Sequence, residues 1–458
     1  MKFKKNIFCI GGGHVGGITM AFIAGKCPQY KVTVYDINKK LIGSWNSDNL
    51  PIYEPGLEEI VKSVRNKNLF FTTELAKGIK EAEIIFVCVN TPTKDYGIGA
   101  GYAADLYYWE QAARDIMKFS ESDKIVVEKS TVPVKTAQAM ERILNTSSKK
   151  IHFEVISNPE FLAEGTAIKN LEQPDRVLIG YRNTPQGQKA RDAIVEIYAN
   201  WVPKEKIITL DIWSSELSKL ASNAFLAQRI SSINSISALC EKTECSISEV
   251  SLAIGKDKRI GPEFLNASIG FGGSCFKKDI LNLVYLCRHH GLHEVANYWE
   301  AVIKLNEYQK NRFVEMILNS MFNNLANKKI CLFGFAFKAN TSDTRETPAL
   351  TIAIRLLEEK AKLVITDPQA LNNAKKDLQK ADDTVEYIED PYKAVKGCDA
   401  IAVLTEWEIY KHLDYLKIYK LMRKPAFIFD GRNILDHEKL FALGFNVYPI
   451  GKPPMKHF

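Results

Sequence analysis

The chain has 458 residues, 46% of them hydrophobic and 25% charged, which is the composition of a globular protein with substantial cores. Its net charge of +7 is modest and its lysines are scattered, which excludes a nucleic-acid-binding surface. No apolar run reaches the roughly 18 residues of a membrane span, and nine cysteines without paired spacing suit a reducing compartment. We therefore expect a cytoplasmic protein with no membrane or nucleic-acid partner.

Alternating strands and helices open the chain. A buried strand over 6–10 runs into a glycine-rich turn over 11–16, a helix is expected over 17–24, and a second strand over 32–35 ends on Asp36. This order predicts right-handed βαβ units on a parallel sheet. A G-x-G-x-x-G pattern between a strand and a helix is typical of a dinucleotide site.

The three glycines of this pattern and the acid have separate expected roles. Gly11 allows the tight turn, Gly13 lets the backbone approach a pyrophosphate, and Gly16 lets the helix pack closely on the strand. Asp36 would accept hydrogen bonds from the adenosine ribose and repel a 2′-phosphate, which favours NAD over NADP. The lysines at 39–40 leave NADP open, because they could reach such a phosphate.

Two more buried strands, over 82–89 and 124–127, each run into a polar loop. Ligands bind at the carboxyl ends of parallel strands, so both loops should line the cofactor. Thr131 and Pro133 also suit a helix cap and a first-turn proline for a helix ending at Leu144, a role that needs no catalysis. The residues expected at the cofactor are His14, Val15, Val89, Asn90, Thr91, Pro92, Thr93, Ser130, Thr131 and Val132.

A strand over 153–157 is followed by two carboxylates four residues apart, Glu160 and Glu164. On a solvated loop such a pair would mean nothing. At the end of a sheet strand, beside the apolar Phe161 and Leu162, at least one should be partly buried with a raised pKa. Either carboxylate could then exchange protons near neutral pH.

Residues 214–241 contain no Gly or Pro, and their apolar positions recur at intervals of three and four. This pattern predicts one long helix that joins two halves of the molecule. Lys219 and Asn223 share a face of it, either as a surface pair or as a buried functional pair. The large apolar faces of this region favour a dimer. Shorter helices are expected over 247–254, 279–287 and 295–316.

The stretch Gly270–Cys275 has three glycines in four positions before a helix expected to start at Ser274. A thiol at a helix N-terminus, with Lys277 and Lys278 nearby, has the surroundings that favour a thiolate. The alternative is a glycine turn before an ordinary helix. The other eight cysteines should be small buried hydrophobes.

A second βαβ pattern begins at 328, with strands over 329–334 and 363–367 that mimic the first two. Here Phe335–Lys338 replaces the glycine turn, so this copy should not hold a dinucleotide pyrophosphate. Lys338, Arg345 and Arg432 at strand-end loops indicate a different phosphate group.

The expected fold is therefore α/β, with two Rossmann-like, doubly wound parallel-sheet domains joined by a long central helix and a helical domain. Residues 1–212 would form the NAD-binding domain, 213–325 the central helical domain that dimerises, and 326–458 a C-terminal Rossmann-like domain that binds a different phosphate group. His289, His290 and His293 have no Cys or Asp at ligand spacing, so no metal is expected.

Several stretches make the chain resemble the UDP-glucose/GDP-mannose dehydrogenase family over nearly its whole length, with the animal-type members nearest. The stretches are Ile52–Leu57, Val89–Thr93, Glu128–Pro133, Ser157–Gly165, Ser215–Leu220, Gly270–Cys275 and Phe429–Arg432. The resemblance implies a four-electron oxidation of UDP-glucose to UDP-glucuronate that consumes two NAD. It implies that residues 326–458 bind the UDP-sugar. It also implies an oligomer, either a dimer or a hexamer, in which Arg259 can reach the active site of a neighbouring subunit.

In the pattern that the resemblance implies, Cys275 forms a thiohemiacetal and then a thioester with the substrate. Lys219 and Asn223 stabilise the oxygen on C6, while Asp279 and Glu160, with Thr131, move protons in an order that stays open. Glu164 and Arg345 would also meet NAD. The implied substrate residues are Glu160, Phe161, Leu162, Ala163, Glu164, Lys219, Asn223, Arg259, Asn266, Ser268, Phe271, Gly272, Phe337, Lys338 and Arg432.

Three other functions stay open. The same chemistry could act on GDP-mannose or UDP-N-acetylmannosamine. A two-electron dehydrogenase of the hydroxyacid or acyl-CoA kind would also pair a lysine with an asparagine, but it has no use for Cys275. A sensor that binds a nucleotide sugar without catalysis would not need the whole set of catalytic residues. Leu41, Tyr102 and Asn266 depart from the family pattern, which affects expected NAD, assembly and uridine contacts.

Overall fold

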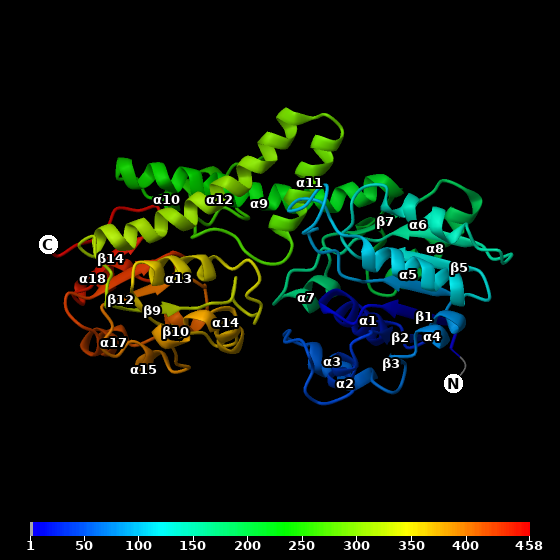
Figure 1. Ribbon diagram of the computed structural model, residues 1–458, viewed down its shortest axis with the longest axis horizontal. Helices are drawn as coiled ribbons and strands as arrows, with labels where there is room; N and C mark the ends of the chain where they lie inside the picture. The colour runs from blue at the N-terminus through cyan, green and yellow to red at the C-terminus, as the bar shows by residue number, and fades with distance from the viewer. Residues whose placement is uncertain (1–2) are drawn as a thin grey trace. The chain divides into compact units, whose positions relative to one another are not determined.

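The computed structural model describes residues 3–458, apart from the side chains of 381–383, as two compact units. The first unit contains the residues up to 222 together with 281–291, and the second contains 223–280 and 292–458. Each unit is built around its own sheet (Figure 1).

The sheet of the first unit has the strand order β3-β2-β1-β4-β5-β6-β7-β8. The strands from β3 to β6 are parallel and follow the order of a dinucleotide-binding sheet. β6 and β7 pair antiparallel, so the expectation of a wholly parallel sheet is wrong at this one junction. The strands are β1 (Lys5–Ile10), β2 (Tyr30–Tyr35), β3 (Leu69–Thr72), β4 (Ile84–Val87), β5 (Lys124–Glu128), β6 (Phe153–Ser157), β7 (Val177–Tyr181) and β8 (Ile207–Asp211). The helices are α1 (His14–Lys26), α2 (Lys39–Trp45), α3 (Leu57–Val64), α4 (Leu75–Glu81), α5 (Tyr107–Phe119), α6 (Thr136–Leu144), α7 (Ala167–Glu172) and α8 (Pro185–Tyr198).

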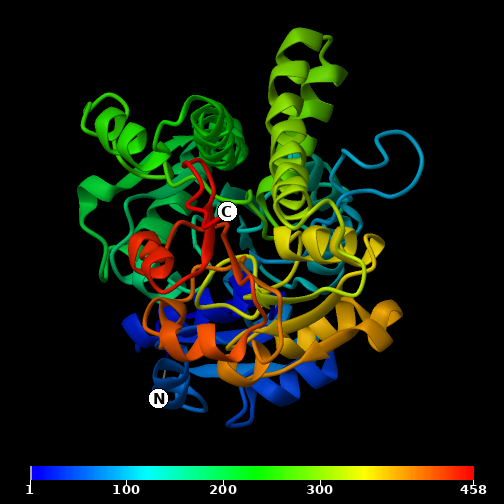
Figure 2. The ribbon, with the colours of Figure 1, turned by 90° about the vertical axis from the view of Figure 1, so that its left-hand side faces the viewer.

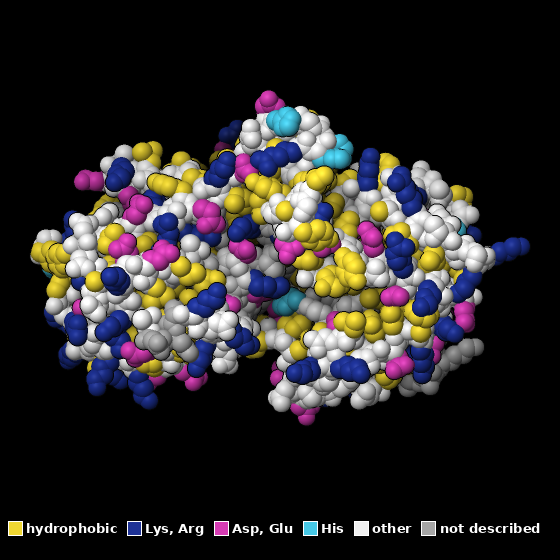
Figure 3. Space-filling view, viewed as in Figure 1, with side chains coloured by type: hydrophobic (Ala, Val, Ile, Leu, Met, Phe, Trp, Pro, Cys, Tyr) yellow, Lys and Arg dark blue, Asp and Glu magenta, His cyan; other side chains and the backbone are white. Residues whose placement is uncertain are grey.

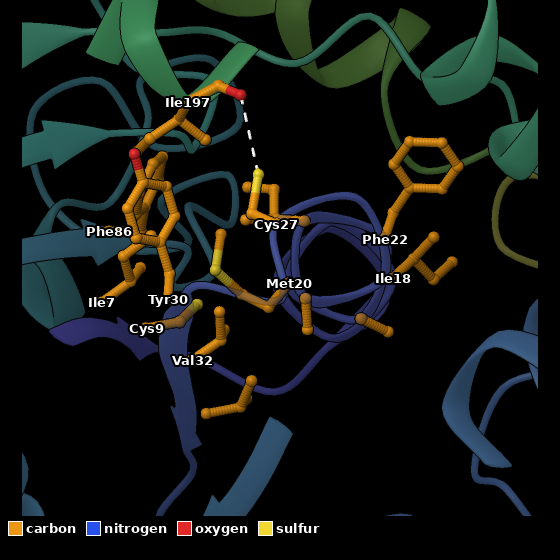
Figure 4. Close-up of a cluster of buried hydrophobic side chains, with 14 of the residues drawn as sticks. Ile7, Cys9, Ile18, Met20, Phe22, Cys27, Tyr30, Val32, Phe86 and Ile197 are labelled. Atoms are coloured by element: carbon orange, nitrogen blue, oxygen red, sulfur yellow. Dashed lines mark hydrogen bonds between the residues drawn. The ribbon is translucent and has the colours of Figure 1, made fainter. Parts of the chain in front are cut away.

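The core of the first unit surrounds α1. Residues 16–24 of this helix are all buried, because it is apolar all round and not only along one stripe. Figure 4 shows Met20 of α1 beside Cys9 of β1 and Val32 of β2, and Ile18 on the other side of the helix beside Phe22. The Cys27 thiol, just after α1, lies 3.7 Å from the carbonyl oxygen of Ile197 (Figure 4). This burial fixes the N-terminus of α1 beside the glycine turn.

The sheet of the second unit has the order β11-β10-β9-β12-β13-β14 and is parallel throughout. Its strands and the helices around them run from yellow to red in Figures 1 and 2. The strands are β9 (Lys329–Phe333), β10 (Lys362–Thr366), β11 (Val385–Tyr387), β12 (Ala400–Val403), β13 (Phe427–Asp430) and β14 (Asn446–Pro449). The helices are α13 (Pro348–Glu358), α14 (Leu371–Asp377), α15 (Pro391–Ala394), α16 (Glu408–Lys411), α17 (Tyr415–Leu421) and α18 (His437–Ala442).

Four helices follow the last strand of the first sheet in the sequence and precede the first strand of the second sheet. The long helix expected over 214–241 is α9, which extends over Ile212–Thr243. The others are α10 (Ile247–Gly255), α11 (Phe276–His289) and α12 (His293–Ser320). The predicted fold class, two Rossmann-like sheets connected through a long helix and a helical segment, is confirmed.

Basic and acidic side chains are mixed on the face shown in Figure 3, without one basic stripe. Within residues 3–458, none of the helices combines the length and the apolar character that crossing a membrane requires.

Candidate active site

The glycine turn after β1 has the geometry that its sequence indicates. Gly11 has φ +111°, and a Cβ on it would lie 2.5 Å from the carbonyl oxygen of Cys88. A Cβ on Gly16 would lie 2.0 Å from the carbonyl oxygen of Gly11, so only glycine permits this approach of helix and strand. A Cβ on Gly13 would meet no atom within 4 Å. The turn is therefore closed toward the protein and open where a dinucleotide pyrophosphate would fit.

Asp36, at the end of β2, faces this turn. Its Oδ2 accepts a hydrogen bond from the Gly12 N–H at 2.9 Å, and its Oδ1 accepts one from the Asn38 N–H at 2.9 Å. The side chain is only half-buried, so it can still receive ribose hydroxyls. His14 and Val15 are also half-buried at the start of α1.

The two polar loops after β4 and β5 are bonded to each other. The Ser130 hydroxyl donates to the carbonyl oxygen of Val89 at 2.6 Å, and the Thr91 hydroxyl donates to that of Thr131 at 2.9 Å. The predicted cofactor residues of both loops thus lie together at one edge of the sheet. Asn90 is exposed there, and Pro92, Thr93 and Thr131 are half-buried.

The expectation that Thr131 caps a helix is wrong. Helix α6 begins at Thr136, after Lys135 with φ +74°. The N-terminus is capped by Glu216 of α9, whose carboxylate accepts hydrogen bonds from the N–H groups of Lys135 and Ala137 at 2.7 and 2.8 Å. Thr131 is therefore not a helix cap, and its catalytic role stays a prediction.

Glu216 lies against a second buried carboxyl, that of Glu128 at the end of β5. Burial raises the pKa of Glu216 to about 7. Burial and the neighbouring Glu216 carboxyl raise the pKa of Glu128 well above its ordinary value. Sequence reasoning did not single out these two carboxyls; the raised carboxyl pKa expected at Glu160 or Glu164 stays a prediction.

Glu160 is partly buried, as expected, and it has a partner that sequence reasoning missed. Its Oε2 lies 2.9 Å from the Nζ of Lys129, and 3% of the Lys129 side chain is exposed. Lys129 also donates to the Asn158 side-chain oxygen at 3.2 Å and to the Tyr198 hydroxyl at 3.1 Å. The available signal was a lysine directly after an apolar strand, where a buried cation requires a counter-charge.

Two cations lie close to the Phe161 ring. Its ring centroid is 4.0 Å from the Arg176 guanidinium and 5.0 Å from the Nζ of Lys219. Leu162 and Glu164 are half-buried and Ala163 is exposed in the same loop. The structure thus brings Lys219 to the loop that carries Glu160.

Lys219 and Asn223 are both buried on α9, so they are not a surface pair. The Asn223 side-chain amide donates to Asp279 Oδ2 at 2.6 Å. The other oxygen of Asp279 lies 2.9 Å from the Nζ of Lys278, and 1% of the Asp279 side chain is exposed. Asp279 of α11 and Asn223 of α9 therefore form one buried polar cluster.

Cys275 is exposed and is the last residue before α11. The helix begins at Phe276, two residues later than expected, and the Asp279 N–H donates to the Cys275 carbonyl at 2.9 Å. Cys275 thus caps the helix, with its sulfur beside the helix N-terminus and 3.5 Å from the Ser274 hydroxyl. Lys277 is paired with Glu346 at 2.8 Å.

Among the other cysteines, the expectation of burial holds for six and is wrong for two. Cys245 is exposed and Cys88 is half-buried. Cys88 lies against Gly11 and Gly16, where the tight glycine turn leaves part of it uncovered.

The loop that leads to Cys275 is held by Asn306 of α12, another residue that sequence reasoning missed. Asn306 accepts a hydrogen bond from the Phe271 N–H at 2.8 Å and donates to the Phe271 carbonyl at 3.0 Å. A Cβ on Gly272 would lie 2.6 Å from the Glu346 carbonyl oxygen. Ser268 is buried, and Asn266 is exposed.

The loops of the second sheet meet this segment. The Phe337 ring would lie 3.0 Å from a Cβ on Gly273, and the Arg345 carbonyl accepts from the Gly273 N–H at 2.9 Å. Arg432 donates to the Phe337 carbonyl at 3.0 Å, and the Nζ of Lys338 is 5.6 Å from the Phe337 ring. Arg432 also lies 3.3 Å from the Glu406 carboxylate, with 11% of its side chain exposed, and its expected contact with phosphate stays a prediction.

Two predicted arginines have acid partners in their own turns. Arg345 donates to Asp343 at 2.9 Å. Arg259 pairs with Asp257 at 2.7 Å, and 89% of its side chain is exposed.

Fold and site together define a dinucleotide-dependent dehydrogenase with a second Rossmann-like unit. Three family models match the chain: the UDP-glucose/GDP-mannose dehydrogenase family NAD binding domain at residues 5–202, the central domain at 213–308 and the UDP binding domain at 331–437. The chain belongs to the UDP-glucose/GDP-mannose dehydrogenase family, and its cofactor is NAD.

Similar proteins include UDP-glucose 6-dehydrogenase 5 of Oryza sativa subsp. japonica, 60% identical over 98% of this chain and 97% of the relative. UDP-glucose 6-dehydrogenase 4 of Arabidopsis thaliana is 59% identical with the same coverage. These relatives are plant proteins, so they do not support the expected animal-type likeness.

Among solved structures, a UDP-glucose dehydrogenase from Pyrobaculum islandicum is similar with a TM-score of 0.86 and 30% identity, covering 98% of each chain. A UDP-D-ManNAc dehydrogenase from Pyrococcus horikoshii has a TM-score of 0.81 and 25% identity, covering 98% of this chain and 99% of that one.

Proposed function

We propose that the protein oxidises UDP-glucose to UDP-glucuronate, a four-electron reaction that consumes two NAD and passes through a thioester on Cys275. The carrying observation is an exposed thiol at a helix N-terminus, in a chain 60% identical to a UDP-glucose 6-dehydrogenase over 98% of its length. NAD, when bound, supplies the acceptor for a hydride in each oxidation.

The residues at the glycine turn would hold NAD. Gly13 would leave room for the pyrophosphate, and Asp36 would accept hydrogen bonds from the ribose hydroxyls. The loops that contain Thr91 and Ser130, which are hydrogen-bonded to each other, would line the cofactor at the same edge of the sheet. In the second unit, Lys338 and Arg432 would bind the UDP diphosphate.

The sugar chemistry would use the chain's own side chains in sequence. A base takes the proton of the C6 hydroxyl as the first hydride leaves, and the resulting aldehyde is attacked by the Cys275 thiolate. Lys219 and Asn223 stabilise the oxygen on C6 while it carries negative charge. Loss of the second hydride gives the thioester, which keeps the aldehyde from escaping. Water then releases the carboxylate.

Titration of limiting UDP-glucose with excess NAD tests this function directly. We expect two NADH for each UDP-glucose, together with a product that carries one more negative charge. One NADH for each substrate, or unchanged NADH production by Cys275→Ser, would overturn the thioester route.

A second candidate substrate class is another nucleotide sugar, favoured by the likeness to the UDP-D-ManNAc dehydrogenase structure. Assaying UDP-glucose, GDP-mannose and UDP-N-acetylmannosamine side by side with NAD separates the candidates. We expect kcat/KM to be highest for UDP-glucose.

We also propose a homo-oligomer in the cytoplasm. The helices of the second unit carry exposed apolar side chains, namely Phe225, Leu239, Leu252 and Tyr298, with exposed fractions of 60%, 58%, 64% and 54%. All nine cysteines are free thiols, which suits a reducing compartment. Light scattering after gel filtration would show a dimer or a hexamer, and a monomer would contradict the proposal.

A further inference from the structure

Trp45, the last residue of α2, reaches the glycine turn after β1. Its indole N–H donates a hydrogen bond to the carbonyl oxygen of Gly12 at 2.9 Å. Trp45 is fully buried, and Gly12 is buried with it. Leaving a buried carbonyl without a donor is unfavourable, so this contact fixes the direction in which the Gly12 carbonyl points.

The direction of this carbonyl sets the direction of the next N–H group. The peptide bond between Gly12 and Gly13 is trans, and in a trans peptide the C=O and N–H groups point in opposite directions. The Gly12 carbonyl points to the buried indole, so the Gly13 N–H points away from it. Gly13 is exposed, and a Cβ on it would meet no atom within 4 Å. The Gly13 N–H therefore faces the open side of the turn, where the NAD pyrophosphate would bind.

Trp45 is held against the turn from two sides. Its ring stacks on that of Phe71 in β3, with the ring centroids 5.0 Å apart and an interplanar angle of 7°. On α1, a Cβ at Gly17 would lie 2.2 Å from the Trp45 ring, so only glycine admits the ring at this position. Gly17 is not part of the G-x-G-x-x-G pattern, and the contact with Trp45 gives it a separate reason. Packing on both sides keeps the indole N–H directed at Gly12.

The N–H group of Gly12 is bound as well, by Asp36 Oδ2 at 2.9 Å. The two polar groups of Gly12 thus have partners at the two ends of segment 36–45, which contains α2. These partners differ in accessibility: Asp36 is half-buried and can meet the ribose, whereas Trp45 has no exposed surface. Any effect of Trp45 on the cofactor is therefore transmitted through the peptide between Gly12 and Gly13.

We propose that Trp45 is a positioning residue of the NAD site: by binding the Gly12 carbonyl, it holds the Gly13 N–H toward the cofactor pyrophosphate. Without the indole N–H, the carbonyl would be buried and unsatisfied, and turning it toward water would relieve this. That rotation of the peptide would take the Gly13 N–H away from the anion. The inference rests on NAD as the cofactor and not on which nucleotide sugar is oxidised.

The test compares two tryptophan variants of the first unit, Trp45→Phe and Trp201→Phe. Trp201 is the matched control, because its indole N–H also donates to a backbone carbonyl, that of Leu171, at 2.8 Å. Both variants keep an aromatic ring and lose one indole–carbonyl hydrogen bond, and only the first loses it at the glycine turn. A third protein carries benzothienylalanine at position 45, where sulfur replaces the indole N–H and the two fused rings are kept.

The measurements are the Kd of NAD by titration calorimetry, the Kd of adenosine by ligand-observed NMR, and thermal unfolding. Adenosine lacks the pyrophosphate, so it reports on the rest of the adenosine site. For both changes at position 45 we expect the Kd of NAD to rise about 10-fold, which corresponds to the loss of one net hydrogen bond. The Kd of adenosine should stay within about 2-fold, and Trp201→Phe should leave both constants within about 2-fold.

An unchanged Kd of NAD in the benzothienylalanine protein would overturn the inference. So would an equal loss of affinity for NAD and for adenosine, since this would indicate a distorted adenosine site and not a turned Gly13 N–H. An equal rise in the Kd of NAD in Trp201→Phe would overturn it too. If Trp45→Phe does not fold, the benzothienylalanine protein decides by itself, because it keeps the volume of the ring. NADH production from UDP-glucose does not enter this test, so failure of the proposed function would leave its outcome unaffected.

Discussion

The two sheets share the strand order 3-2-1-4-5-6, and in each the second strand is followed by an aspartate, Asp36 in one unit and Asp367 in the other. Asp36 is half-buried and receives the N–H groups of Gly12 and Asn38. Asp367 is 1% exposed and receives five donors. The donors are the N–H groups of Phe335, Ala336, Gln369 and Ala370 and the Trp407 indole.

The turns that follow β1 and β9, the first strands of the two sheets, also differ in how many of their N–H groups are left for a ligand. In the first unit, α1 begins at His14, so β1 leads almost directly into a helix whose N-terminus faces the open turn. In the second unit, β9 ends at Phe333 and α13 begins only at Pro348. The turn N–H groups that the first unit offers to a ligand are bound by Asp367 in the second. Equal topology therefore does not give equal binding, since the backbone donors are already satisfied in one copy.

The largest expected effect on stability is that of Asp367→Ala. It leaves five donors without their acceptor, so we expect a loss of at least about 4 kcal/mol of unfolding free energy. Urea unfolding measures it. The matched control, Asp36→Ala, should change stability by less than about 1 kcal/mol while weakening NAD binding about 10-fold in a fluorescence titration. Equal destabilisation by the two variants would contradict the comparison.

The strand-end acids should make the first unit sensitive to pH. The raised folded pKa of Glu216, about 7, means that the protonated form is favoured in the fold, so its stabilisation is present below about pH 4.5 and is lost as pH rises to 7. The loss is about 3 kcal/mol. The counterpart acid in the second unit, Asp430, is instead paired with His437 at 2.9 Å.

Hydrogen exchange measures this difference. Between pH 5 and 8, the protection factors of the Lys135 and Ala137 amides, which Glu216 caps, should fall while those of β13 do not. Glu128→Gln, which keeps a neutral side chain beside Glu216, should flatten the dependence. Protection that is constant with pH in wild type would contradict it.

Glycine substitutions in the turn after β1 distinguish the position that is packed against the protein, Gly16, from the position that is open to a ligand, Gly13. Gly16→Ala places a Cβ 2.0 Å from the Gly11 carbonyl oxygen, and we expect destabilisation of about 2 kcal/mol. Gly13→Ala meets no atom within 4 Å, so stability should stay within about 0.5 kcal/mol while NAD affinity falls. Thermal unfolding with and without NAD measures both. A larger stability loss for Gly13→Ala than for Gly16→Ala would refute this account of the turn.

A modest loss of stability is expected at Asn38, whose side chain caps α2 by accepting from the N–H groups of Lys40 and Leu41. Asn38→Ala should remove about 1 kcal/mol of unfolding free energy. In the second unit, Asp367 itself accepts from the N–H groups of Gln369 and Ala370, directly before α14. In the first unit, two side chains, Asp36 and Asn38, bind the backbone N–H groups after the second strand, whereas Asp367 alone does so in the second unit. Urea unfolding measures the contribution of Asn38. A loss above about 3 kcal/mol would argue against this division of the hydrogen bonds between two side chains.

Much of the fold followed from local patterns. The buried strands, the G-x-G-x-x-G turn and the long helix without Gly or Pro were predicted to within a few residues, because hydrophobic periodicity and glycine geometry act over short stretches. Local patterns failed at two helix starts. Helix α6 begins only at Thr136, after Lys135 with its positive φ, and not at residue 131. Helix α11 begins at Phe276, after Ser274 and Cys275.

The sequence by itself determined two nucleotide-binding folds, an NAD-type turn and an exposed candidate nucleophile, Cys275. Only the tertiary structure decided which charged side chains meet: Lys129 with Glu160, Glu128 with Glu216, and Asp367 with the turn that would otherwise be open. The physical reason is that such pairs join the ends of different strands and helices. Their energies depend on burial and on distances of about 3 Å between groups far apart in the chain, which no local pattern of residues encodes.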